Sequence, residues 1–127
     1  MSFLGQVRKK ALQANRRIVL PETSDERVIR AASQILKEGL AQVILVGNQE
    51  TIMHSAKAYE VSLSGAKIVD PYNFERFNDY VNKLVELRAK KGMTPEEAKK
   101  LLLNNPTFFG AMLVRMGDAD GMVSGSS

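Results

Sequence analysis

The stretch RIVLPETSDERVIRAA, from Arg17 to Ala32, joins two hydrophobic patterns through a polar segment. RIVL is a short apolar run of the kind that forms a buried strand. Val28 begins an apolar repeat at helical spacing, and Gly39 stands just after the repeat, where helices commonly end. The stretch therefore predicts a buried strand, a polar loop and an amphipathic helix.

The same alternation continues along the chain. Apolar runs predict strands near Ile18–Leu20, Val43–Val46, Lys67–Val69 and Met122–Ser124. Helical patterns lie near 3–12, 28–38, 49–60, 74–91, 95–104 and 106–116, with Asn48 as a cap and Thr94, Pro95 and Glu97 as a helix start. Alternating strands and helices are typical of a mainly parallel sheet covered on both faces. We expect a three-layer α/β/α fold whose ligands gather beyond the carboxyl ends of the strands.

Composition limits the class of protein. A chain of 127 residues with 44% hydrophobic and 25% charged residues is typical of one soluble globular domain. No apolar run approaches the roughly 20 residues of a membrane helix, and residues 1–15 lack the pattern of a secretory signal. The absence of cysteine excludes disulfides, thiolate catalysis and cysteine-based metal sites. We expect a cytoplasmic protein without a membrane partner.

The net charge of +4 does not indicate a nucleic-acid partner. The basic residues stand in separate pairs, mostly beside predicted helix ends, and no nucleic-acid-binding module is recognisable. A solvated surface explains most of them, and attraction to a small phosphorylated ligand is the alternative.

The polar segment PETSDER lies at the carboxyl end of the first predicted strand. Thr23 and Glu26 fit a capping box at the start of the helix. Glu22 and Asp25 are acid–base candidates, but no histidine or metal-ligand partner accompanies them. Arg27 stands in the first helical turn, where the helix dipole disfavours a cation. It is explained either by an anionic ligand or by a salt bridge to Glu22, Asp25 or a distant acid.

A second arginine continues an apolar stripe on the long predicted helix. Phe77, Val81 and Leu84 share one face, and at about 100° per residue Arg88 points within roughly 40° of all three. Such an arginine either lies at the rim of the core or binds a buried anion, for which its planar guanidinium suits phosphate. The two lysines at positions 90 and 91 add positive charge at the same helix end.

The remaining polar features are less specific. His54, the only histidine, lies in a polar helix and is expected to be exposed. The segment GDADGMVSGSS could cradle phosphate through backbone N–H groups, but it matches neither a P-loop nor a GxGxxG motif. The sequence contains no metal-ligand constellation.

Taken together, these segments resemble phosphate acetyltransferases (phosphotransacetylases). The resemblance is collinear over the whole chain and rests on IVLPETSDERVIRAA, VILVGN, KIVDP, LVELRAKKGMTPEEA and FFGAMLVRMGDADGMVSG. Phosphate butyryltransferases and the acyl-coenzyme A-binding C-terminal module of some malic enzymes share the fold and are the alternatives. A start at Met1 favours the enzyme over an appended, non-catalytic module.

The resemblance implies reversible acetyl transfer between coenzyme A and phosphate, with coenzyme A as a substrate and without a metal. Arg88 matches the arginine of the family's ELRxxKG segment, which holds the 3′-phosphate of coenzyme A. Arg27 matches the family's DxR arginine and is the second candidate for coenzyme binding. The resemblance places no catalytic residue within this chain, and it implies that a second coenzyme A-binding arginine would lie just past Ser127.

The family's enzymes are more than twice as long as this chain. We therefore expect residues 1–127 to be the N-terminal portion of the first domain of a two-domain fold like that of isocitrate and isopropylmalate dehydrogenases. On this expectation, the second domain and the returning C-terminal segment of the family's fold would lie outside these residues. This portion alone is expected to be inactive and to leave an apolar face or sheet edge uncovered. The complete enzyme is expected to be a homodimer.

Overall fold

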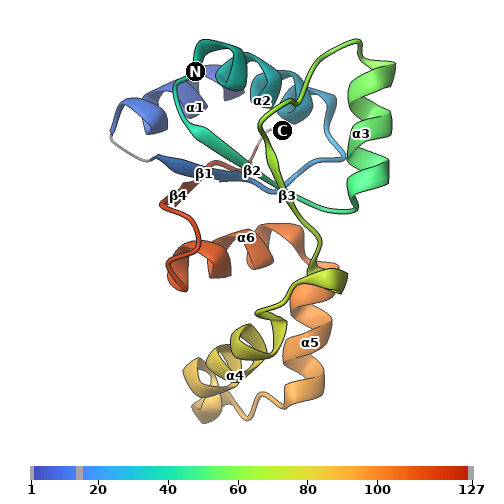
Figure 1. Cartoon of the computed structure of the whole chain (residues 1–127). Helices are drawn as coiled ribbons and strands as arrows, with labels where there is room; N and C mark the ends of the chain where they lie inside the picture. Colours follow the sequence, from blue (N-terminus) through green and yellow to red (C-terminus); the bar gives the residue numbers. More distant parts are fainter. Residues whose placement is uncertain (1, 14–15, 126–127) are drawn as a thin grey trace.

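The computed structural model describes residues 2–13 and 16–125 as an α/β fold (Figure 1). The expectations about the chain ends rest on Met1, Ser126 and Ser127. These residues lie outside the described ones. The strands are β1 (Arg17–Leu20), β2 (Gln42–Val46), β3 (Lys67–Val69) and β4 (Gly121–Met122). The helices are α1 (Phe3–Leu12), α2 (Glu26–Glu38), α3 (Gln49–Ala58), α4 (Phe77–Leu87), α5 (Pro95–Asn104) and α6 (Pro106–Arg115), with 3₁₀ turns η1 (Pro71–Asn73) and η2 (Ala89–Lys91).

The four strands form one parallel sheet in the order β3-β2-β1-β4. Ile18 of β1 is paired with Val43 of β2 on one side and with Gly121 of β4 on the other. The predicted parallel pairing of the first two strands is confirmed. The fourth strand was predicted at 122–124 but begins and ends earlier. The Val123 N–H still donates to β1, whereas the following chain turns toward the loop after β1.

Helices cover both faces of the sheet. Figure 1 shows α1, α2 and α3 against one face and α6 against the other, with α4 and α5 lying beyond α6. The predicted three-layer α/β/α arrangement with a parallel sheet is therefore confirmed. None of the helices in the described ranges is long and apolar enough to cross a membrane.

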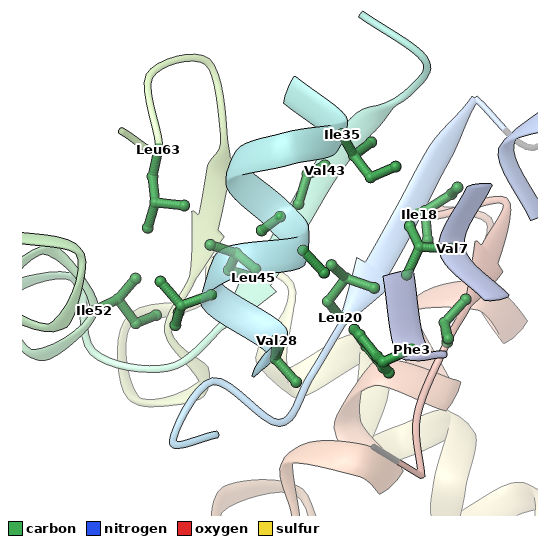
Figure 2. Packing of buried hydrophobic residues seen from close by; sticks show 14 of the residues in the cluster. Phe3, Val7, Ile18, Leu20, Val28, Ile35, Val43, Leu45, Ile52 and Leu63 are labelled. Atoms are coloured by element: carbon green, nitrogen blue, oxygen red, sulfur yellow. The ribbon is translucent and has the colours of Figure 1, made fainter. Parts of the chain in front are cut away.

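Alternate residues of β1 serve two separate cores. Ile18 and Leu20 point toward α1–α3, where they pack with Phe3, Val7 and other buried side chains (Figure 2). Val19 points to the opposite face and packs with α4–α6. This alternation is what a strand buried on both faces requires, and it explains why the three residues after Arg17 in β1 are all apolar.

The core on the α6 face contains an aromatic cluster and a very close helix–sheet contact. Phe74 meets the rings of Tyr80 and Phe109 edge-on, with centroids 4.9 and 5.4 Å apart, and those two rings stack at 5.7 Å. Gly110 of α6 lies directly on the sheet, where a Cβ atom would come within 2.8 Å of Val19 Cγ1. A glycine is therefore needed for α6 to approach β1 this closely.

Most predicted helix boundaries agree with the structure. Gly39 ends α2 in the left-handed conformation with φ 66°, as predicted. Asn48 caps α3 by accepting a hydrogen bond from the Thr51 N–H. Thr94 and Glu97 form the predicted capping box at the start of α5.

The long helix predicted over residues 74–91 is wrong at both ends. Asp70 caps the 3₁₀ turn η1, and Phe74 then takes an extended conformation that places its ring against the aromatic cluster. At the other end α4 stops at Leu87, and Arg88 adopts φ −115° and ψ 21° before the turn η2. Gly92, at φ 71°, ends this turn.

The outer edges of the sheet belong to β3 and β4, each of which pairs on one side only among the described residues. The large hydrophobic side chains that are exposed come from four separate elements: Leu12, Met53, Tyr72 and Leu87. The expected sheet edge is therefore present, and self-association through it stays a prediction.

Candidate functional site

The polar loop after β1 lines a pocket at the carboxyl end of the sheet. Residues 21–25 form one wall of this pocket, and Val46 and Gly47 at the end of β2 form another. Pro106 and Thr107, which begin α6, complete a space of about 390 Å³. The N-terminal ends of α2, α3 and α6 therefore face the same edge of the sheet, as parallel α/β topology requires.

Thr23 fixes the loop to the neighbouring strand. Its hydroxyl donates a 2.8 Å hydrogen bond to the Val46 carbonyl oxygen at the end of β2. Gly47 follows with φ +146°, and a Cβ atom there would lie 3.1 Å from Thr23 Oγ1. The hydroxyl and the glycine together hold the loops after β1 and β2 against each other.

The predicted capping box of Thr23 and Glu26 is wrong. Asp25 is the N-cap of α2, since its carboxylate accepts a 2.8 Å hydrogen bond from the Arg27 N–H. Glu26 is the first residue of the helix and pairs with Arg30 one turn later. The Thr23 hydroxyl instead donates to the Val46 carbonyl oxygen of β2, and the helix begins two residues beyond the position that the capping box requires.

Arg27 pairs with the aspartate that caps its own helix. Its guanidinium contacts the Asp25 carboxylate at 2.8 and 3.2 Å, and 57% of its side chain is exposed. The hydrogen bond to Asp25 raises the pKa of Arg27 above its ordinary value. The salt bridge considered in the sequence analysis is therefore present, and it offsets the unfavourable position of a cation in the first helical turn.

Glu22 has a structural partner that the sequence does not reveal. Its carboxylate accepts a 2.7 Å hydrogen bond from the Gly125 N–H, 103 positions further along the chain. The side chain therefore joins the loop after β1 to the segment that follows β4. The acid–base role considered for Glu22 would need a partner such as a histidine. The only histidine of the sequence, His54, is exposed on α3, and the described residues contain no group able to hold a metal ion.

Arg88 lies at the rim of the core on the other side of the sheet from Arg27. The extrapolation at 100° per residue does not apply to it, because α4 ends at Leu87. Its guanidinium instead lies over the ring of Phe108, with Cζ 5.1 Å from the ring centroid. Since α2 and α4 pack on opposite faces of the sheet, the structure does not bring Arg27 and Arg88 together (Figure 1).

In the described part of the glycine-rich segment after α6, which excludes Ser126 and Ser127, most of the backbone N–H groups that a phosphate cradle would need are already bonded within the protein. The N–H groups of six of the segment's residues donate hydrogen bonds to acceptors within the protein: those of Gly117, Asp118, Ala119, Asp120, Val123 and Gly125. Asp120 accepts hydrogen bonds from the Arg17 side chain and backbone, which lower the pKa of its carboxyl group. Donors already bonded in this way are not available to a ligand.

Asp118 forms a cluster that sequence reasoning missed. Its carboxylate accepts hydrogen bonds from Arg76 at 2.5 and 2.6 Å and from the hydroxyl of the buried Tyr80. Burial, with the hydrogen bond to Asp118, raises the pKa of Tyr80 well above its ordinary value. Asp118 and Arg76 also line a pocket of about 310 Å³ beside β3. The only sequence signal was an aspartate in a glycine-rich turn.

The described residues contain no group of three or more histidine, aspartate or glutamate side chains able to hold a metal ion.

The fold and sequence match one enzyme family along almost the entire chain. The phosphate acetyl/butaryl transferase family model matches residues 2–127. The phosphate acetyltransferase of Acetivibrio thermocellus is 46% identical over 126 residues, which are 99% of this chain and 37% of the relative. That of Bacillus subtilis is 40% identical over 125 residues, 98% of this chain and 38% of the relative.

Two solved structures have the same fold. The EutD phosphotransacetylase from Staphylococcus aureus gives a TM-score of 0.80 at 36% identity, over 98% of this chain and 37% of that one. A phosphotransacetylase from Streptococcus pyogenes gives 0.79 at 38% identity, over 94% and 36%. The chain thus spans little more than a third of the length of these relatives. It belongs to the phosphate acetyl/butaryl transferase family.

Proposed function

We propose that this chain is the N-terminal part of a phosphate acetyltransferase, which transfers an acetyl group between acetyl phosphate and coenzyme A. The products are acetyl-coenzyme A and phosphate, and the reaction is reversible. The observation that carries this proposal is the family match over residues 2–127, joined to relatives named phosphate acetyltransferase that are 46% and 40% identical. These names favour acetyl over butyryl transfer.

The proposal includes Arg88 as a ligand of the 3′-phosphate of coenzyme A. Three observations support this role: the side chain is half-buried, it lies beside the exposed Lys90 and Lys91, and no carboxylate among the described residues forms an ion pair with it. A guanidinium with free N–H groups can bind a phosphate through two parallel hydrogen bonds. Arg27 is proposed as a second, weaker contributor, because its guanidinium is already bonded to Asp25.

The remaining features of the proposal concern the complete enzyme. The catalytic residues are proposed to lie outside this chain, in a second domain of a two-domain fold like that of isocitrate and isopropylmalate dehydrogenases. The enzyme is proposed to be a cytoplasmic homodimer of acetate metabolism. The coverage of about 37% of the relatives supports a division of this kind. The 127-residue chain alone is then expected to show no acetyl phosphate-dependent acetylation of coenzyme A.

Replacement of Arg88 in the complete enzyme tests the binding role. A charge-assisted, bidentate contact to a phosphate is worth about 1.5–3 kcal/mol. Arg88→Ala should therefore raise KM for coenzyme A roughly tenfold or more, with a smaller change in kcat and in KM for acetyl phosphate. Arg88→Lys should restore only part of the loss, because an ammonium group lacks the planar fork.

The 3′-dephospho form of coenzyme A gives the test its specificity. The wild type should prefer coenzyme A, and Arg88→Ala should largely lose this preference. Lys83→Ala is a matched control, since Lys83 lies on α4, the helix that Arg88 follows, and pairs with Glu86 at 3.3 Å. If the wild type uses both coenzyme forms equally while Arg88→Ala unfolds the protein, Arg88 is a structural residue at the rim of the core.

A further inference from the structure

The guanidinium of Arg88 rests on the ring of Phe108, which belongs to a different helix. Arg88 follows α4, whereas Phe108 lies in the first turn of α6, and both side chains are half-buried. The distance of 5.1 Å from Arg88 Cζ to the ring centroid is within the roughly 6 Å over which a cation is attracted to an aromatic face. The contact therefore joins two helices that are not adjacent in the sequence.

The backbone on each side of this contact is fixed. The Arg88 N–H donates to the Leu84 carbonyl oxygen at 3.0 Å, and the Arg88 carbonyl oxygen accepts from Lys91 at 3.0 Å and from Met93 at 3.4 Å. The Phe108 N–H donates to the Asn105 side chain at 3.0 Å. Because both residues are held at their backbones, the ring offers the guanidinium a defined place.

Arg88 differs from the other paired arginines of the described residues because its aromatic contact is not accompanied by a carboxylate ion pair. Arg30 and Arg76 also lie over rings, 5.6 Å from Tyr59 and 5.7 Å from Tyr80, but each is bonded to a carboxylate as well. Among the described residues, ion pairs to carboxylates are formed by Arg8, Arg17, Arg27, Arg30 and Arg76. A carboxylate occupies guanidinium N–H groups and neutralises the charge. An aromatic face attracts the cation without accepting its N–H hydrogen bonds in the way an oxygen does, so the donors stay available to an incoming anion.

We infer that Phe108 is a positioning residue for Arg88 in coenzyme binding. Its ring holds the guanidinium in one place before the ligand arrives and leaves the charge and the N–H donors of Arg88 for the 3′-phosphate. Less side-chain freedom is then lost when the coenzyme binds. This inference rests on the proposed function, since it assigns Phe108 a role only through Arg88.

The test compares Phe108→Leu, Phe108→Tyr and Arg88→Ala in the complete enzyme, with coenzyme A and its 3′-dephospho form as substrates. Phe108→Leu keeps an apolar side chain but removes the aromatic face. It should raise KM for coenzyme A about 3- to 10-fold, the range expected from a cation–π contact at a half-buried site. It should leave kcat and KM for the dephospho form nearly unchanged. Phe108→Tyr should retain the wild-type preference.

Phe77→Leu provides a matched control, because Phe77 is a half-buried phenylalanine on α4 that also packs against the core of the α6 face. It should not change the preference between the two coenzyme forms. The ratio of the two KM values is a property of the folded molecules, so partial unfolding of a variant does not imitate the expected result. The double variant Phe108→Leu/Arg88→Ala should show no further loss beyond Arg88→Ala.

The outcomes distinguish a failure of the role inferred for Phe108 from a failure of the binding role proposed for Arg88. If Arg88→Ala removes the preference but Phe108→Leu leaves it at the wild-type value, or weakens both coenzyme forms equally, Phe108 does not position Arg88. If Arg88→Ala leaves the preference unchanged, the binding role proposed for Arg88 is wrong, and the role of Phe108 is lost with it.

Discussion

Gly110→Ala should destabilise the fold, although alanine is the better helix former. The substitution adds one methyl group at the point where α6 lies on the sheet. A Cβ atom at this position would be 2.8 Å from Val19 Cγ1, 2.9 Å from Met122 Sδ and 3.3 Å from Pro21 Cβ. The methionine side chain can move, but the valine is fully buried on β1 and the proline ring is rigid.

Two opposing terms determine the size of the effect. Replacing glycine by alanine inside a helix stabilises it by about 1 kcal/mol. Inserting a methyl group into a well-packed core costs about 1–3 kcal/mol, and contacts with stiff neighbours place this case toward the upper end. The net expectation is a loss of about 1–2 kcal/mol in the free energy of unfolding.

Urea denaturation measures this loss directly. With a slope of about 2 kcal/mol per molar urea, the midpoint should fall by roughly 0.5–1 M. Gly5→Ala is the comparison variant, because Gly5 lies inside another helix, α1, at a half-buried position, where the same substitution is expected to gain helix propensity. If Gly110→Ala raises the midpoint as much as Gly5→Ala does, the close approach of α6 to β1 has been misjudged.

Three further predictions concern polar contacts. Thr94→Ala removes the capping box of α5 and should lower the free energy of unfolding by about 1 kcal/mol in urea titrations, where an unchanged midpoint would count against it. Tyr80→Phe removes a hydrogen bond to the charged Asp118 and should cost about 1.5–3 kcal/mol by the same assay, and a neutral result would show that this bond is not needed. Hydrogen bonds, first of all from Arg8, lower the pKa of Glu38 from its ordinary value of 4.5 to about 2. The ionised Glu38 therefore contributes fully to stability when the pH is above 4.5, and this contribution is lost as the pH falls through about 2. Carbon-13 NMR should find the Glu38 carboxyl titrating near 2 and moving toward 4.5 in Arg8→Met, and titration near 4.5 in the wild type would contradict the structure.

The strands and the parallel sheet could be predicted from the sequence because their signals are local. The runs IVL in β1 and VILV in β2 are continuously apolar and buried, and burial on both faces is what a parallel sheet imposes on its strands. The C-terminal end of α2 at Gly39 and the start of α5 at Thr94 were likewise predictable, since a glycine or a capping box acts within a few residues.

The details of the candidate site could not be predicted, because they depend on partners far away in the sequence. Thr23 and Asp25 are both good capping residues, and the sequence does not show that the Thr23 hydroxyl bonds the Val46 carbonyl oxygen of another strand while Asp25 caps α2. The environment of Arg88 depends on Phe108, which lies two helices later. A helical wheel assumes that the helix continues, and it carries no information about a side chain beyond the helix end.

The short strand β4 has a consequence for the order in which the chain folds. Ile18 meets Gly121 across 103 positions but meets Val43 across only 25, so closing β4 onto β1 costs about 1 kcal/mol more in chain entropy. Polar contacts hold it at both ends: Arg17 binds Asp120 where β4 begins, and Glu22 binds the Gly125 N–H just beyond its end. We therefore expect the three strands with nearby partners to assemble first and the two-residue strand β4 to dock last.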